Sequence, residues 1–162
     1  MHTTHYTLIF IKTQNHVLLG YKKRGFGQQK WNGFGGKLEE NETISEGAIR
    51  ELFEESNLVV EKQHLHYMGV VTYDDDVHRR IVYIFSASQV EGDLKESDEM
   101  RPQWFEFENI PYHNMWPDSQ FWLPLVLNDH HLQARFTYND YKIYKYNVEQ
   151  LDVIPDLIHV EA

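Results

Sequence analysis

The chain has 162 residues and contains no cysteine. Without cysteine, neither a disulfide framework nor a thiolate metal site is possible. Its apolar runs are too short to span a membrane. Residues 1–6 also lack the basic start and apolar continuation of a signal peptide. We therefore expect a cytoplasmic protein with no membrane partner.

Positive charge is scarce as well, because 25 acidic side chains outnumber 15 Lys and Arg and give a net charge of −10. Such a balance disfavours long nucleic acid as a partner. It does not exclude a single nucleotide, since a bound divalent cation reverses the local field. None of the ten histidines has the spacing of a helical metal site, and we expect the pairs His130 with His131 and His64 with His66 at the surface. This length predicts one domain over residues 1–162, and we expect a monomer.

The most informative stretch is 36–58, which predicts a glycine loop followed by an amphipathic helix. On a helical wheel, Glu51, Glu54 and Glu55 fall within about 100° of one another, and apolar side chains lie on another side. Crowded carboxylates repel one another unless a hard cation lies between them, and Mg²⁺ prefers such oxygen ligands together with a substrate phosphate. Gly47 lies on the acidic face and is expected to leave room for a large ligand. The alternative is an ordinary solvated acidic face.

Three local features favour a metal site over a solvated face. Arg50 lies four residues before Glu54 and is expected to pair with it. Thr43 and Glu46 have the spacing of a capping box, which defines the start of the helix. The glycine-rich segment 33–37 offers bare backbone that can approach a phosphate or a metal ion.

Residues 36–58 resemble the Nudix box, G-x5-E-x7-R-E-U-x-E-E-x-G-U, in which U is a bulky aliphatic residue. The positions that match are Gly36, Glu42, Arg50, Glu51, Leu52, Glu54, Glu55 and Leu58. Asn57 stands where the family has glycine. That position ends the helix, and asparagine is the next-best residue there, so we expect intact chemistry. A pattern with this many fixed positions is highly specific.

The resemblance continues at 22–27, 31–37, 96–102 and 114–118, which are similar to Nudix enzymes that hydrolyse oxidised purine nucleoside triphosphates. It implies an α/β fold, with an α/β/α sandwich around a mixed sheet. It also implies Mg²⁺-dependent hydrolysis of 8-oxo-dGTP-like substrates to nucleoside monophosphate and pyrophosphate, with Mn²⁺ as a substitute cation. The partner would then be a small nucleotide.

The same resemblance implies a set of site residues. The implied catalytic and metal-binding residues are Gly35, Arg50, Glu51, Glu54, Glu55 and Glu99. The implied substrate-binding residues are Thr7, Lys22, Phe26, Asn32, Phe34, Gly36, Lys37, Trp116, Pro117, Asp118 and Ser119. Taken alone, Glu99 is typical of a surface acid, and single lysines are usually solvated.

The aromatic residues are numerous, and a packed core explains most of them. Trp116 differs because it precedes Pro117 and Asp118 in a predicted loop. A flat indole beside a carboxylate suits a purine, since the ring stacks while the carboxyl group binds the edge of the base. The similar enzymes have a second aspartate where this chain has Ser119. A hydroxyl group is shorter and never charged, so the base preference is expected to change.

Strands are predicted from alternating apolar patterns and turn residues at 5–11, 17–21, 66–73, 80–88, 103–107, 133–138 and 142–148. Asn139 and Asp140 are expected to form the last turn, and Asp118 to cap a helix that extends to Leu127.

Two other functions remain open. A Nudix enzyme for a dinucleotide polyphosphate, a sugar nucleotide or another modified purine triphosphate would keep the box and differ only in the pocket. A non-catalytic nucleotide-binding module would be free to lose Glu54 or Glu55, and this chain retains both.

Overall fold

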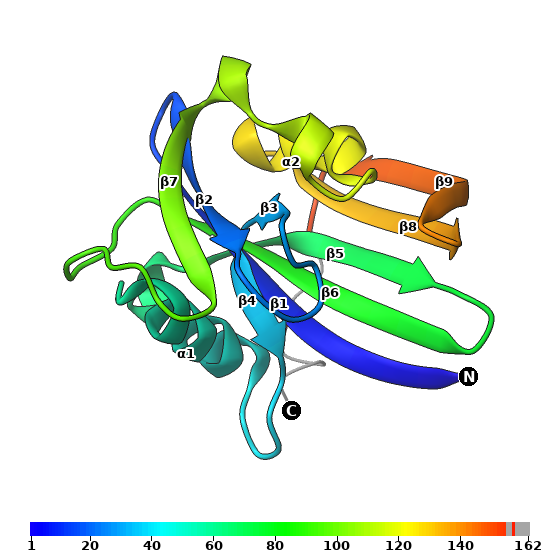
Figure 1. The fold of residues 1–162 in the computed structure, drawn as a ribbon, viewed down its shortest axis with the longest axis horizontal. Helices are drawn as coiled ribbons and strands as arrows, with labels where there is room; N and C mark the ends of the chain where they lie inside the picture. Colours follow the sequence, from blue (N-terminus) through cyan, green and yellow to red (C-terminus); the bar gives the residue numbers. More distant parts are fainter. Residues whose placement is uncertain (155–156, 158–162) are drawn as a thin grey trace.

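A computed structural model describes residues 1–154 and residue 157, and a strongly curled mixed sheet forms its centre (Figure 1). The strand order is β3-β2-β1-β6-β5-β8-β9, with β4 also paired to β1 and β7 to β2. The strands are β1 His2–Lys12, β2 His16–Lys22, β3 Trp31–Asn32, β4 Phe34–Lys37, β5 His66–Asp74, β6 His78–Ala87, β7 Met100–Glu106, β8 His131–Asn139 and β9 Lys142–Leu151. The pairs β1–β6 and β5–β8 are parallel.

Two helices cover opposite faces of this sheet (Figure 1), which confirms the expected α/β/α arrangement. Helix α1 (Ile44–Ser56) packs on one apolar cluster and α2 (Ser119–Leu127) on another. Short 3-10 helices complete the chain: η1 Lys62–His64, η2 Phe107–Asn109 and η3 Tyr112–Asn114. In the described residues, no helix is long and apolar enough to cross a membrane.

Strand β1 shows why both faces of the sheet are buried. Leu8 and Phe10 belong to the cluster under α2, whereas Ile9 and Ile11 belong to the cluster under α1. Successive side chains of a strand point to opposite faces, so a strand covered on both sides has an unbroken apolar run. Because β1 also pairs with β4, the glycine-rich segment lies in the middle of the sheet, beside α1.

Helix α1 begins and ends as predicted. The Thr43 hydroxyl accepts a hydrogen bond from the Glu46 backbone N–H at 3.1 Å, and the Glu46 carboxylate accepts one from the Thr43 N–H, also at 3.1 Å. The helix ends at Asn57, whose φ of 68° is left-handed. Asparagine therefore replaces the family glycine without changing the form of the cap.

The predicted strands are confirmed to within three residues at each end, but two details in the last third of the chain were wrong. Asp118 precedes α2, yet its side chain makes no capping hydrogen bond. The last turn lies one residue later than predicted, because Asn139 pairs with Lys142 and leaves Asp140 and Tyr141 between the strands. Both turn residues have positive φ, 50° and 67°.

Candidate active site

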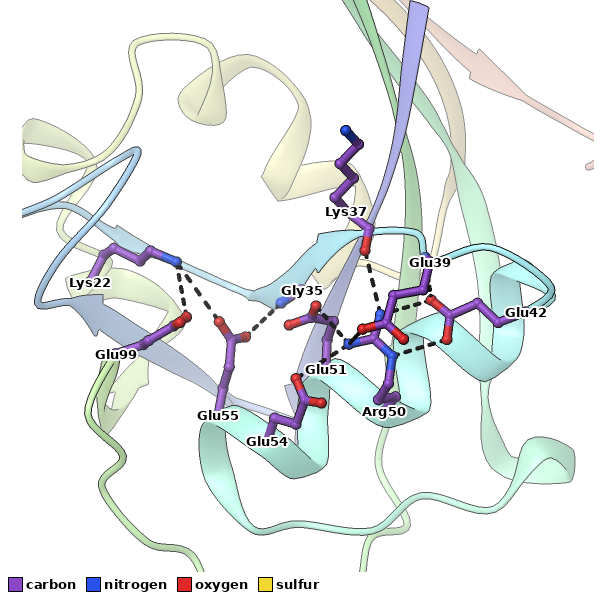
Figure 2. A network of polar contacts seen from close by, with 10 residues as sticks. All are labelled: Lys22, Gly35, Lys37, Glu39, Glu42, Arg50, Glu51, Glu54, Glu55 and Glu99. Carbon is purple, nitrogen blue, oxygen red and sulfur yellow. Dashed lines mark hydrogen bonds and ion pairs between the residues drawn. The ribbon is translucent and has the colours of Figure 1, made fainter.

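Arg50 organises the acidic end of the site (Figure 2). Its Nη1 lies 3.0 Å from a Glu51 oxygen and 3.2 Å from a Glu54 oxygen, so the predicted pairing with Glu54 is confirmed. Its Nε and Nη2 donate to the two oxygens of Glu42 at 2.9 and 2.7 Å. This bidentate pair lowers the pKa of Glu42 and raises that of Arg50. One guanidinium group therefore holds three carboxylates in fixed orientations.

Glu55 is the buried acid of the group, with only 3% of its surface exposed. One of its oxygens accepts the Gly35 N–H at 2.8 Å, and the other lies 4.0 Å from Lys22 Nζ. The same Lys22 nitrogen lies 3.5 Å from a Glu99 oxygen, so Lys22 lies between these two acids (Figure 2). Burial raises the pKa of Glu55 to about 8, although the Gly35 hydrogen bond opposes the shift. Burial also raises the pKa of Glu51.

These groups line one open cleft of about 420 Å³. Its walls are Lys22, Arg24, Gly35, Gly36, Glu51, Glu54, Glu55, Ser97, Asp98 and Glu99. The fold thus gathers every predicted metal-binding residue, although they come from β4, from α1 and from the segment before β7.

The chemistry of this cleft fits a hard divalent cation. Among residues 1–154 and 157, no three acidic or histidine side chains are already grouped closely enough to hold a metal ion. Glu51 and Glu54 are instead bound by Arg50, and Glu55 and Glu99 lie beside Lys22. Carboxylate oxygens are nevertheless the ligands that Mg²⁺ prefers. Burial raises the pKa values of Glu51 and Glu55 by disfavouring their charged forms, and a cation bound beside them would stabilise those charged forms.

Two glycines of the site allow close packing. A Cβ atom at Gly36 would lie 2.6 Å from a Glu51 oxygen, so only glycine leaves that carboxylate in place. A Cβ atom at Gly47 would lie 2.5 Å from the Leu38 side chain and 3.0 Å from a Glu42 oxygen. The space at Gly47 is therefore filled from within the protein, and the expectation that it admits a ligand was wrong.

Trp116 lies in the irregular segment between η3 and α2, as predicted. Its ring stacks on Phe26, with centroids 5.3 Å apart, and Lys30 Nζ lies 5.3 Å from its centroid. The Phe26 ring is 72% exposed, and the Arg80 guanidinium lies 5.5 Å from its centroid. Phe26 and Trp116 thus form an accessible aromatic pair with cations beside it.

Asp118 is buried, and its carboxylate is engaged inside the protein. It accepts hydrogen bonds from the Tyr73 hydroxyl at 2.5 Å, the Tyr138 hydroxyl at 2.6 Å and the Trp122 Nε1–H at 2.7 Å. This network joins α2 to β5 and β8. A role for Asp118 in binding the edge of a base stays a prediction, and it would require exchange of some of these bonds.

The other predicted substrate contacts lie in varied environments. Phe34 is fully buried, and its ring packs in the cluster under α1. Lys37 is exposed, and Asn32 and Pro117 are half-buried. Thr7 is buried, and within the described part of the chain its hydroxyl has no hydrogen-bond partner. For all of these residues, Phe34 included, substrate binding stays a prediction.

Comparison with known proteins identifies the family. Residues 1–126 match the NUDIX domain. The chain belongs to the Nudix family. It is 45% identical over 150 residues to the oxidized purine nucleoside triphosphate hydrolase of Mus musculus, covering 91% of this chain and 95% of that protein. The protein of the same name from Danio rerio is 42% identical over 153 residues, covering 93% and 96%. The crystal structure of a MutT protein from Bacillus halodurans superposes with a TM-score of 0.79 at 26% identity, covering 90% of this chain and 97% of that one.

Two sets of contacts in this Nudix site are not predicted from the sequence: those of Glu42 with Arg50, and those of Asp118 with Trp122 and Tyr138. Glu42 matches the Nudix box, but only the structure shows that it is the bidentate partner of Arg50. The spacing of Asp118 and Trp122, four residues apart on a helix, is a signal that could have indicated their contact. Tyr138 offers no such signal, because pairing of distant strands brings it to Asp118.

Proposed function

We propose that this chain hydrolyses oxidised purine nucleoside triphosphates of the 8-oxo-dGTP kind to nucleoside monophosphate and pyrophosphate. It thereby removes oxidised nucleotides from the nucleotide pool. The carrying observation is the cleft in which Arg50-bound carboxylates, buried Glu55 and Lys22 meet. Phosphoryl transfer needs such a site, with oxygen ligands for a cation and a lysine for phosphate. The 45% identity to the mouse enzyme supports the choice of substrate.

Each group in the cleft has a proposed role. Glu51, Glu54, Glu55 and Glu99, with the Gly35 carbonyl, would hold Mg²⁺ or, in its place, Mn²⁺. A bound cation supplies charge neutralisation at the phosphates and lowers the pKa of a bound water. Arg50 positions Glu51 and Glu54, because its fork fixes their carboxylates. Lys22 and Lys37 bind phosphate oxygens, and the absent side chain of Gly36 keeps Glu51 in place.

The base is assigned to the aromatic side of the site. Phe26 and Trp116 supply a stacking surface that accepts any purine. The residues proposed to select the base are Thr7, Asn32, Pro117, Asp118 and Ser119.

A substrate panel with product analysis tests this function. Purified protein with Mg²⁺ should convert 8-oxo-dGTP to its monophosphate and pyrophosphate, with a higher kcat/KM than for dGTP. Release of diphosphate and inorganic phosphate would contradict the proposed cleavage point. Equal kcat/KM values for 8-oxo-dGTP and dGTP would contradict the proposed substrate.

One observation favours a second Nudix function. The Asp118 carboxylate already accepts three hydrogen bonds inside the protein, and Ser119 replaces a carboxyl group of similar enzymes. A different base or a different leaving group would follow from a changed pocket. The same panel should therefore include a dinucleotide polyphosphate, a sugar nucleotide and other modified purine triphosphates. Any turnover that requires a divalent cation excludes a purely binding module.

The proposal includes a cytoplasmic monomer that acts on free nucleotides. The net charge of −10 supports free nucleotides over long nucleic acid as partners. Light scattering coupled to gel filtration tests the monomer, and a dimer mass would contradict it.

A further inference from the structure

The turn between β8 and β9 has an unfavourable sequence for its shape. Asp140 and Tyr141 both have positive φ, 50° and 67°, as a two-residue type I′ turn requires. Asp is common in such turns, but glycine is the favoured residue at the second position. A bulky residue with this φ is a conformational outlier, and outliers of this kind gather at functional sites.

The ring of this strained residue lies over the aromatic side of the site. Tyr141 is 76% exposed, and its ring is nearly parallel to that of Trp116, at 16°, with centroids 6.4 Å apart. Phe26 lies closer to the same indole, at 5.3 Å. Near-parallel rings with centroids 6.4 Å apart fall within the range of roughly 4.5–7 Å found for offset-stacked aromatic pairs. Tyr141 therefore extends the stacked surface of Phe26 and Trp116, and its exposed ring adds to the area open to a flat ligand.

The position of the hairpin explains how Tyr141 reaches this place. Strands β8 and β9 lie beside α2 (Figure 1), and Trp116 lies just before α2 in the chain. The Tyr138 hydroxyl, near the tip of β8, donates to the Asp118 carboxylate and accepts from the Asp118 N–H, and these bonds fix the two segments to each other. The hairpin tip is thus held next to Trp116 by a partly buried contact, and Tyr141 does not rely on its own exposed ring to stay there.

We propose that Tyr141 is a specificity-determining residue of the base site, and that its ring, together with those of Trp116 and Phe26, forms the surface on which the purine of the substrate stacks. This inference rests on the proposed function and names one more residue for it. A stack of this kind favours the two-ring purines over pyrimidines, because the larger face overlaps more of this surface. The strained φ of Tyr141 is then explained, since glycine would suit the turn but offer no ring.

Tyr141→Gly separates function from folding. Glycine removes the ring and also relieves the left-handed strain, so the melting temperature should hold or rise. The KM for dGTP and 8-oxo-dGTP should rise about five- to hundredfold, the range found for loss of one base-stacking ring, with a smaller change in kcat. Tyr141→Phe should stay within about twofold of wild type. Tyr144→Ala is the matched control, because Tyr144 lies on the same hairpin and is 73% exposed.

Binding of 8-oxo-dGMP, measured by calorimetry, gives a readout that does not depend on turnover. Wild type should bind it more tightly than Tyr141→Gly, and Tyr141→Asn, a second ring-free variant suited to positive φ, should match the glycine variant. Unchanged KM and affinity in a folded Tyr141→Gly protein would overturn the inference. Equal wild-type kcat/KM for dGTP and 8-oxo-dGTP would instead overturn the proposed substrate, while the effect of Tyr141 on the KM for dGTP would still decide the inference.

Discussion

Glu55→Gln should stabilise the cation-free protein at alkaline pH while it destroys activity. Burial raises the pKa of Glu55 from 4.5 to about 8. Between these values the folded state binds a proton that the unfolded state has lost, so the contribution of Glu55 to stability falls as pH rises from 4.5 to 8. Glutamine is neutral at every pH and keeps an oxygen for the Gly35 N–H.

The size of the effect follows from the same shift. A change in pKa from 4.5 to about 8 sets an upper bound of about 5 kcal/mol on the destabilisation by ionised Glu55. Because Glu55 is only 3% exposed, solvent screening reduces this little. We therefore expect Glu55→Gln to match wild type near pH 5 and to exceed it by about 2–5 kcal/mol near pH 8.5.

Urea denaturation in chelator at both pH values measures this difference. Glu54→Gln is the matched control, because Glu54 lies on the same helix but its side chain is 55% exposed, and it should show no comparable gain at high pH. With Mg²⁺ present, Glu55→Gln should lower kcat at least about a hundredfold. The absence of a pH-dependent gain in stability would refute the electrostatic reasoning. Near-wild-type kcat in the folded variant would refute the catalytic role.

Three further outcomes test the site. Chelation should abolish turnover, and added Mg²⁺ should restore it. Because Glu55 must lose its proton to bind a cation, calorimetry should show that the affinity for Mg²⁺ rises as pH rises towards 8. An affinity that does not change with pH would contradict this. Arg50→Lys should lower kcat at least about tenfold, since an ammonium group cannot form the bidentate pair with Glu42, whereas equal kcat would make Arg50 dispensable. Tyr138→Phe should cost about 1–2 kcal/mol in urea denaturation by removing a donor to Asp118, and an unchanged midpoint would show that the bond adds nothing.

The sequence alone determined the local elements of this protein. The capping residues Thr43 and Glu46 fix the start of α1, and Asn57 fixes its end, because caps depend on neighbours within one turn. The 3.6-residue period likewise places Glu51 and Glu54 within reach of Arg50 on the same helix. Alternating apolar residues located the long strands, but β3 was missed because it has only two residues, and β4 because its glycines interrupt the pattern.

Only the tertiary structure decided which distant residues each helix and strand contacts. Phe34 lies among residues of the predicted loop, yet pairing of β4 with β1 places its ring in the core. Lys22 contacts Glu99, 77 residues away, and Asp118 accepts a hydrogen bond from Tyr73, 45 residues away. No local sequence pattern predicts such long-range contacts. Local periodicity fixes which side chains share a face, because it depends on backbone geometry within a few residues. The partners of that face depend on strand order and register, which only the packing of the whole sheet selects.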